Sequence, residues 1–367
     1  MKRQIVFLRG LAILAVVGHH ATAWGFVAMF WWTHRYVPTS VPDYSGMGSL
    51  SYWLLTALNQ VALFSVPAFL FISGFSAVYS LGSGTWRGDW RVVRTRLGAL
   101  IGPYVVWSLI VYSIDAALGQ TLTPAEYVVR LLTGEVIDAY YFVPMLAQFY
   151  VLSPLIVRAA RSRPRLLLGI AIAIQAVTTI APYVAAGAAR PAHPLLDLPG
   201  WSALRWPAYY VLGTVVGARP RPILRSLSRC RTPLLACAAA LALLTVAEAD
   251  ILWRWTAEWD WAHGGFRLSS TLYSLAFVLL ALTWRVAPSP TTHAVERAGA
   301  LSYGIYLMHP KALELGARAI YHLAPGLLAR QIAFAVVLFA VPLAGCWLAM
   351  VLVARSPARR VYHVVFG

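Results

Sequence analysis

The sequence predicts an all-α fold, a polytopic bundle of about ten membrane-spanning helices. Apolar residues make up 60% of the 367 positions and charged residues only 12%, with a mean hydropathy of +0.67. Apolar segments long enough to cross a bilayer recur along the whole chain. Basic and acidic connections alternate between those segments, as in a multi-pass membrane protein. This pattern excludes an ordinary soluble domain and a barrel of short alternating strands.

The ten expected spans share length and low charge; in order they are 5–32, 50–81, 97–118, 139–158, 166–186, 201–217, 234–253, 269–287, 301–322 and 330–353. The first is too long for the apolar part of a signal peptide, so we expect a retained helix. The sixth is short and contains Pro207, which predicts a tilted or kinked helix shielded by its neighbours. Since no linker separates the spans, one domain is expected over residues 1–367.

The distribution of arginine predicts the topology. With the N-terminus in the cytoplasm, clusters at 87–96, 158–165, 219–231 and 355–360 lie on that side, where only Asp89 and Glu296 are acidic. Cytoplasmic loops collect Lys and Arg, so both termini are expected there and the protein in the cytoplasmic (inner) cell membrane. The net charge of +17 therefore reflects topology and does not predict a nucleic-acid partner.

The first span carries two ionisable residues in an otherwise apolar setting, Arg9 and His20. Eleven residues at about 100° each make about three turns, which places both on nearly one face, roughly 16 Å apart. An arginine in lipid costs at least a few kcal/mol, and a buried histidine needs polar partners. The pair therefore predicts a site that faces a polar cavity inside the bundle. His19 points about 100° away and is expected to pack or to support the site from behind.

Five stretches carry further polar or aromatic motifs: LRGLA at 8–12 followed by His20, FLFISGF at 69–75, RVVRTR at 91–96 with IGPY at 101–104, YFVPML at 141–146, and LSYGIYLMHP at 301–310. In this order they resemble the integral-membrane acyltransferase-3 family. The first matches its Arg-x10-His signature, and the last its Leu-Ser-Tyr-Gly-Ile-Tyr-Leu-x-His-Pro segment. Two departures affect the subfamily: Tyr141 stands where the family usually has Trp, and Gly102 precedes Pro103.

The resemblance implies an acyl-CoA-dependent O-acyltransferase. Such an enzyme moves an acyl group, often acetyl, from cytoplasmic acyl-CoA to a hydroxyl of a sugar or of a lipid-linked or cell-surface glycan. Acyl-CoA, a carbohydrate acceptor and the lipid bilayer are then the expected partners, with no permanently bound cofactor. The chemistry agrees, because a hydroxyl is a poor nucleophile and a histidine titrates near neutrality. His20 is thus expected to act as general base or as transient acyl carrier.

Arginines are the expected ligands of the donor. Arg9 is predicted to bind the CoA phosphates or to stabilise charge on the thioester oxygen, unless it only snorkels to the interface. The loop that carries Arg91, Arg94 and Arg96 would face the cytoplasm, where CoA arrives. Phosphate binding and topology control are both open for these three residues.

Polar and aromatic residues of other spans are predicted to form the acceptor side. The expected substrate-binding residues come from three spans: Ser73, Tyr141, Phe142 and His309. Asn59 and Gln60 are expected to hydrogen-bond across helices, and Lys311 and Glu314 to neutralise one another at i, i+3 spacing. The tryptophans at 253–261 with Glu258 and Asp260 fit membrane anchoring, or sugar binding on the outer face.

Other kinds of site lack support. The chain has no phosphate-cradling glycine loop, no His-Glu-x-x-His helix and no Gly-x-Ser-x-Gly elbow, and its three cysteines are scattered. No metal site is therefore expected. The alternative class is a transporter of a glycan intermediate or of a proton-coupled solute, although no inverted repeat is evident. A small glycosylated secondary metabolite is the alternative acceptor.

Overall fold

The computed structural model describes residues 2–32, 42–81, 85–187 and 198–367. All regular structure in these ranges is helical. The longer helices are α1 (Lys2–Phe30), α2 (Leu50–Val61), α3 (Ser65–Ser80), α4 (Trp86–Ala117), α6 (Phe142–Ser162), α7 (Pro164–Gly187), α8 (Pro207–Ala218), α10 (Arg231–Thr256), α12 (Leu268–Ala281), α14 (Ser302–Leu323) and α15 (Gln331–Arg355). Shorter helices connect them: α5 (Pro124–Thr133), α9 (Pro220–Arg229), α11 (Trp259–His263), α13 (Pro290–Ala300) and α16 (Tyr362–Phe366).

The helical membrane bundle is confirmed. Among the described residues, eight helical segments are long and apolar enough to cross a membrane. The other two expected spans, 201–217 and 301–322, coincide with α8 and α14. Helix α8 has 12 residues and thus a length of about 18 Å, against about 30 Å for the hydrocarbon core. The number of ten spans and the cytoplasmic termini stay predictions.

Two segments differ from the expected boundaries. The basic stretch 87–96, expected as a loop, is the first part of α4, which begins after Thr85 caps the Gly88 N–H. Arginine is a good helix former, so nothing interrupts the helix there. The expected span 269–287 ends at Ala281. The Gln4 side chain donates to the carbonyls of Leu282 and Trp284, which replaces helical hydrogen bonds that α12 no longer supplies.

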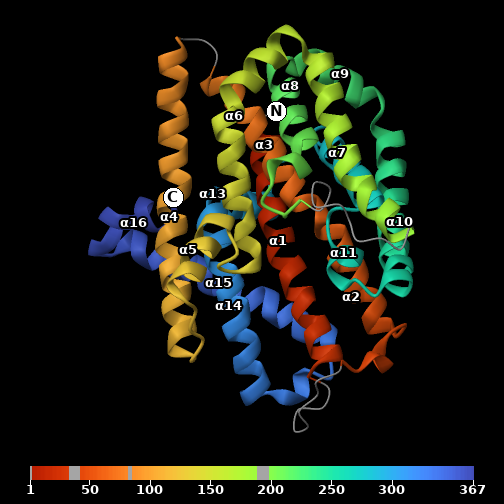
Figure 1. The fold of residues 1–367 in the computed structure, drawn as a ribbon, viewed down its shortest axis with the longest axis vertical. Coiled ribbons are helices and arrows are strands. Elements are labelled where there is room, and N and C mark those ends of the chain that lie inside the picture. The colour runs from red at the N-terminus through yellow and green to blue at the C-terminus, as the bar shows by residue number, and fades with distance from the viewer. Residues whose placement is uncertain (1, 33–41, 82–84, 188–197) are drawn as a thin grey trace.

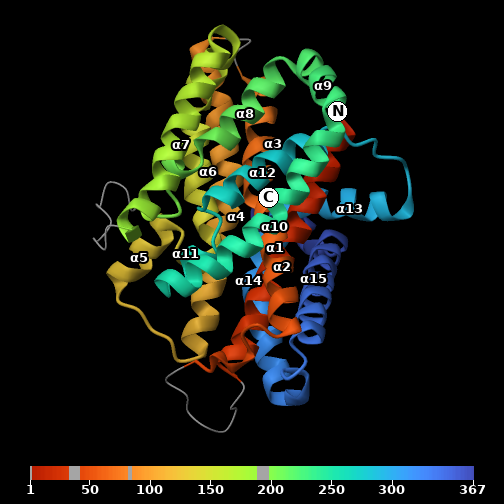
Figure 2. The same ribbon diagram turned by 90° about the vertical axis from the view of Figure 1, so that its right-hand side faces the viewer.

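Helix α1 runs through the middle of the bundle (Figure 1) and contacts α2, α3, α13, α14 and α15. Helix α4 forms one edge, while α7, α9 and α10 lie on the opposite side (Figure 1). Seen from the side, α14 and α15 lie next to each other near one end of the molecule (Figure 2). Because it is central, α1 places its polar residues against several helices at once.

Glycines let two helix pairs pack backbone to backbone. A Cβ at Gly74 of α3 would lie 2.0 Å from the Tyr210 carbonyl oxygen, and a Cβ at Gly213 of α8 would lie 2.0 Å from the Phe71 carbonyl oxygen. Helices α3 and α8 are therefore closely packed at these two glycines. Gly10 plays the same part where α1 meets α13. The glycine of the LRGLA motif thus has a packing role beside Arg9.

Helix α13 is tied to the start of α1 by an ion pair. The Arg3 Nε donates to the Glu296 carboxylate across 2.6 Å. This hydrogen bond holds the pKa of Glu296 below its ordinary value. The contact helps to fix the segment that leads into α14.

Candidate active site

His20 of α1 lies against His309 of α14. Their ring centroids are 5.2 Å apart, and the His19 ring lies 5.4 Å from that of His20. The His309 Nδ1 faces the Tyr306 carbonyl oxygen at 2.7 Å. Since a carbonyl only accepts, Nδ1 carries the hydrogen, and Nε2 keeps its lone pair. That Nε2 is buried without a hydrogen-bond partner among the described residues. The arrangement brings a second basic nitrogen next to His20.

The same two helices meet a second time through Arg9. Its Nε donates to the Ser302 hydroxyl across 2.7 Å. Ser302 is the first residue of α14 and belongs to the LSYGIYLMHP motif. The first and last motifs of the sequence therefore contact each other twice, and α1 and α14 are fixed in register by these contacts.

A cavity of about 1000 Å³ lies beside these residues. Its wall contains eight of the residues named individually from the sequence: Arg9, His19, His20, Ser73, Arg96, Tyr141, Phe142 and Asp260. The expectation that Arg9 and His20 share one polar cavity agrees with this geometry. His19, expected to pack or to support the site from behind, also lies on the wall.

One part of the cavity is basic. Arg96 of α4 donates to the Ser80 hydroxyl at 2.7 Å and to the Ser76 carbonyl oxygen at 3.2 Å, and its guanidinium lies 5.6 Å from the Tyr150 ring centroid. The charges of Arg9 and Arg96 both act on Tyr150, which also interacts with Ser73. Two guanidinium groups from different helices are thus held near one ring, an arrangement suited to an anionic group.

The other part of the cavity is aromatic and acidic. It lies near Phe142, about 12 Å along α6 from Tyr150 at the helical rise of 1.5 Å per residue. Tyr141 stacks on Trp206 with centroids 6.1 Å apart and planes at 18°. The carboxylates of Asp138 and Asp260 line the same region and interact electrostatically. Such a surface suits a neutral, hydroxyl-rich ligand, because rings cover its apolar faces and carboxylates accept its hydrogen bonds.

Three predicted residues lie elsewhere. Arg91 and Arg94 are exposed on α4 and do not line the cavity, in contrast to Arg96. His309 is fully buried behind His20 and is not part of the wall. Its predicted contact with substrate therefore lacks an exposed surface in this structure. Donor binding by Arg91 and Arg94 stays a prediction.

Polar pairs outside the cavity follow the expected pattern. The Lys311 Nζ lies 2.5 Å from Glu314 Oε2, as expected, and 2.7 Å from Asp115 Oδ1 of α4. In the segment 253–261, Trp253 and Trp259 pack on each other with ring centroids 5.3 Å apart. Asp260 is the one residue of this segment that lines the cavity. Within the described chain, no three His, Cys, Asp or Glu side chains group as metal ligands.

Sequence reasoning missed several wall residues. Ser302 lies inside the LSYGIYLMHP motif, and Tyr150 follows the YFVPML motif by four residues. The motifs therefore indicated these regions without assigning either residue a role. Trp206 follows a short 3₁₀ turn before α8 and reads as a membrane-interface tryptophan. Arg267 does not line the cavity, but it is fully buried ahead of α12. In the sequence it has the pattern of a charge that flanks a span, so it gave no signal of a role.

Comparison with known proteins gives one match. A family model described as an acyltransferase domain matches residues 3–351 of this chain. No curated protein and no solved structure matches the chain.

Proposed function

The chain belongs to the acyltransferase-3 family, and we propose that this membrane acyltransferase moves an acyl group, acetyl in the first instance, from cytoplasmic acyl-CoA to a hydroxyl of a sugar or lipid-linked glycan. It acts in the cytoplasmic membrane. The observation that carries the proposal is the contact between His20 and His309 at a cavity whose wall also holds Arg9.

His20 is the proposed general base. Its imidazole accepts the proton of the acceptor hydroxyl while that oxygen attacks the thioester carbonyl carbon. A C–O bond forms, the C–S bond breaks, and the proton passes from His20 to the departing CoA thiolate. Atoms and charge balance without any further reactant. The His309 ring packs against His20, with centroids 5.2 Å apart, and helps to hold the proposed base in place.

Arg9 and Arg96 are the proposed ligands of the CoA phosphates. Arg9 lies about 16 Å along α1 from His20, which is too far to share one thioester oxygen with it. The extended pantetheine arm of CoA can bridge such a separation. Bidentate, charge-assisted contacts to phosphate are what two guanidinium groups offer in a partly enclosed site.

The aromatic and acidic part of the cavity is the proposed acceptor site. Tyr141 and Trp206 present stacked rings, and Asp138 and Asp260 present hydrogen-bond acceptors. A sugar has apolar ring faces and hydroxyl donors, which match these two features. These four side chains support a carbohydrate over an apolar acceptor.

Binding and turnover of acetyl-CoA by the purified protein in detergent test the proposal. We expect wild type to bind acetyl-CoA and to hydrolyse it slowly with water in place of the acceptor. The His20→Ala protein should bind the donor but lose about 10²- to 10⁴-fold in turnover, the usual contribution of a general base. His322→Ala is the matched control, because His322 is exposed near the far end of α14. Full turnover in folded His20→Ala protein contradicts the role of His20.

The acceptor and the intermediate require a labelled donor. After incubation of membranes with acetyl-labelled CoA, label in saponifiable glycan supports the proposed acceptor, whereas label in a small extractable glycoside supports the secondary metabolite. Label retained on the protein, and lost in His20→Ala, identifies His20 as an acyl carrier. Folded protein that binds no CoA contradicts acyl transfer and favours a transporter.

A further inference from the structure

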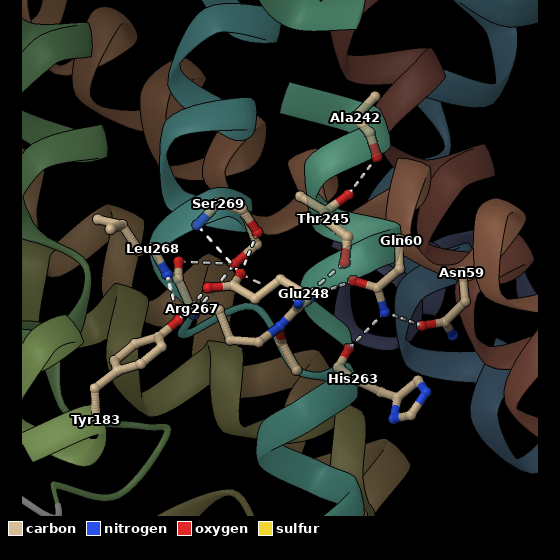
Figure 3. Close-up of polar contacts among 12 residues, drawn as sticks. Asn59, Gln60, Tyr183, Ala242, Thr245, Glu248, His263, Arg267, Leu268 and Ser269 are labelled. Atoms are coloured by element: carbon tan, nitrogen blue, oxygen red, sulfur yellow. Dashed lines mark hydrogen bonds and ion pairs between the residues drawn. The ribbon is translucent and has the colours of Figure 1, made fainter. Parts of the chain in front are cut away.

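Arg267 is a fully buried cation at the start of α12, within the helical segment Trp259–Ala281 that is apolar enough to cross a membrane. Its Nη1 donates to the Thr245 carbonyl oxygen at 3.0 Å and lies 3.3 Å from Glu248 Oε2. Its Nη2 donates to Gln60 Oε1 of α2 (Figure 3). Burial of a charge is costly unless the charge is paired and hydrogen-bonded, which these contacts provide for Arg267.

The carboxylate of Glu248 is shared. It also accepts from the Ser269 amide and hydroxyl, and its other oxygen accepts from the Tyr183 hydroxyl. Glu248 therefore neutralises Arg267 from α10 while it caps the beginning of α12. The hydrogen bond from Arg267 to Gln60 does not neutralise charge, because the Gln60 amide is neutral. It connects Arg267 to α2, which lies between Arg267 and α1.

The amide groups beyond Arg267 are oriented in one direction. A guanidinium only donates, so the Gln60 oxygen must face Arg267 and its nitrogen must face away. The Gln60 Nε2 donates to Asn59 Oδ1 at 3.1 Å and to the His263 carbonyl oxygen at 3.2 Å. The Asn59 Oδ1 thus faces Gln60 (Figure 3), and the Asn59 Nδ2 is left to donate to another partner. One buried cation thus fixes the orientation of two successive amides.

The last donor reaches the turn of α1 that carries the histidines. Asn59 Nδ2 donates to Thr22 Oγ1 at 3.1 Å and to the His19 carbonyl oxygen at 3.3 Å. The His19 Nδ1 lies 3.2 Å from the Asn59 carbonyl oxygen and carries the hydrogen of that bond. This leaves the His19 Nε2 as an acceptor, with the ring on the cavity wall. The connection runs over three elements, from the start of α12 through α2 to α1.

We infer that Arg267, Gln60 and Asn59 are positioning residues for His20, which act by holding the His19–Thr22 turn of α1 in place. Reacting groups must be placed within a fraction of an ångström for efficient proton transfer, and His20 lies inside this turn. The inference rests on the proposed function, because it assigns these residues to the turnover step. A role in turnover distinguishes these three residues from residues that only stabilise the helix bundle.

Gln60→Glu is the discriminating variant. A carboxylate at this position keeps an acceptor for Arg267 and adds an ion pair, so the fold is expected to persist. It removes both donors of the Gln60 amide and sets oxygen against Asn59 Oδ1 and the His263 carbonyl. We expect kcat for acetyl-CoA turnover to fall about 10- to 100-fold with KM for acetyl-CoA changed less than about 2-fold.

Gln175→Glu is the matched control. Gln175 is a buried glutamine of α7 whose Oε1 accepts from the Ala208 amide. It is not part of the chain of hydrogen bonds from Arg267 through Gln60 and Asn59 to α1. Its carboxylate variant should leave kcat of the folded protein within about 2-fold of wild type. A similar fall of kcat in both variants assigns the effect to buried charge in general and overturns the inference.

Asn59→Asp decides the case in which Gln60→Glu does not fold. It keeps the acceptor for Gln60 but removes the donor to Thr22 and to the His19 carbonyl, so the same loss of kcat is expected. Wild-type kcat in folded Asn59→Asp or Gln60→Glu protein overturns the inference. His20→Ala separates the two proposals. If turnover is lost in His20→Ala but unchanged in Gln60→Glu and Asn59→Asp, only the positioning role is rejected. If turnover is unchanged in all three variants, the proposed function is rejected as well.

Discussion

The imidazole of His20 lies 5.2 Å from that of His309, ring centroid to ring centroid. The two residues come from the first and the last motif of the sequence, and they meet because α1 and α14 pack side by side. His309 donates from Nδ1 to its own helix, which turns Nε2 into an acceptor. The pair therefore combines a histidine on the cavity wall with a fixed basic nitrogen behind it.

Removal of the His309 ring should lower turnover without affecting donor binding. In His309→Leu, His20 loses the ring that packs against it, its placement for proton transfer changes, and kcat is expected to fall about 10-fold or more. KM for acetyl-CoA should remain near wild type, because His309 does not line the cavity. Steady-state kinetics checks this. An increase in KM at unchanged kcat supports instead the predicted contact between His309 and substrate.

Arg9→Ala should weaken donor binding. Loss of charge-assisted contacts to phosphate costs about 1.5–3 kcal/mol, which raises the Kd for acetyl-CoA about 10- to 100-fold. Titration calorimetry with CoA measures it directly. Arg359→Ala, at an exposed arginine near the C-terminal end, is the control for a general loss of positive charge. Unchanged affinity in Arg9→Ala assigns Arg9 to anchoring at the membrane interface.

The three arginines of the 91–96 stretch should behave differently. Arg96 lines the cavity and is held by Ser76 and Ser80, whereas Arg91 and Arg94 are exposed. We expect Arg96→Ala to raise the Kd for CoA about 10-fold, and Arg91→Ala and Arg94→Ala to change it less than about 2-fold. Equal effects of all three variants support the donor-binding role predicted from sequence for the whole stretch.

Gly213→Ala should destabilise the bundle, because the new Cβ would lie 2.0 Å from the Phe71 carbonyl oxygen. Backbone displacement of this kind costs about 1–3 kcal/mol or more. Gly169→Ala in α7 is the control, since no atom lies within 4 Å of its added Cβ and alanine favours helix by about 1 kcal/mol. Thermal unfolding in detergent should show a lower Tm for Gly213→Ala only. Equal Tm values contradict close packing of α3 on α8.

Part of the site could be predicted because the residues concerned lie close together in the sequence, within one helix. Arg9 and His20 belong to one helix, so the helical period alone places them on one face. Lys311 and Glu314 likewise pair within one helix. Arg91 and Arg94 show the limit of this reasoning: they share a stretch with Arg96, but only the last of the three faces the cavity. Which face of a helix is enclosed depends on its neighbours.

The sequence by itself determined the class of the fold, the approximate positions of the spans and the pair on α1, since hydropathy and helical periodicity are properties of single segments. Only the tertiary structure decided that Ser302 binds Arg9, that His309 lies behind His20, and that Arg267 reaches α1 through Gln60 and Asn59. Those contacts join residues far apart in the chain. They depend on helix packing and rotation, which close approaches such as Gly74 on Tyr210 fix.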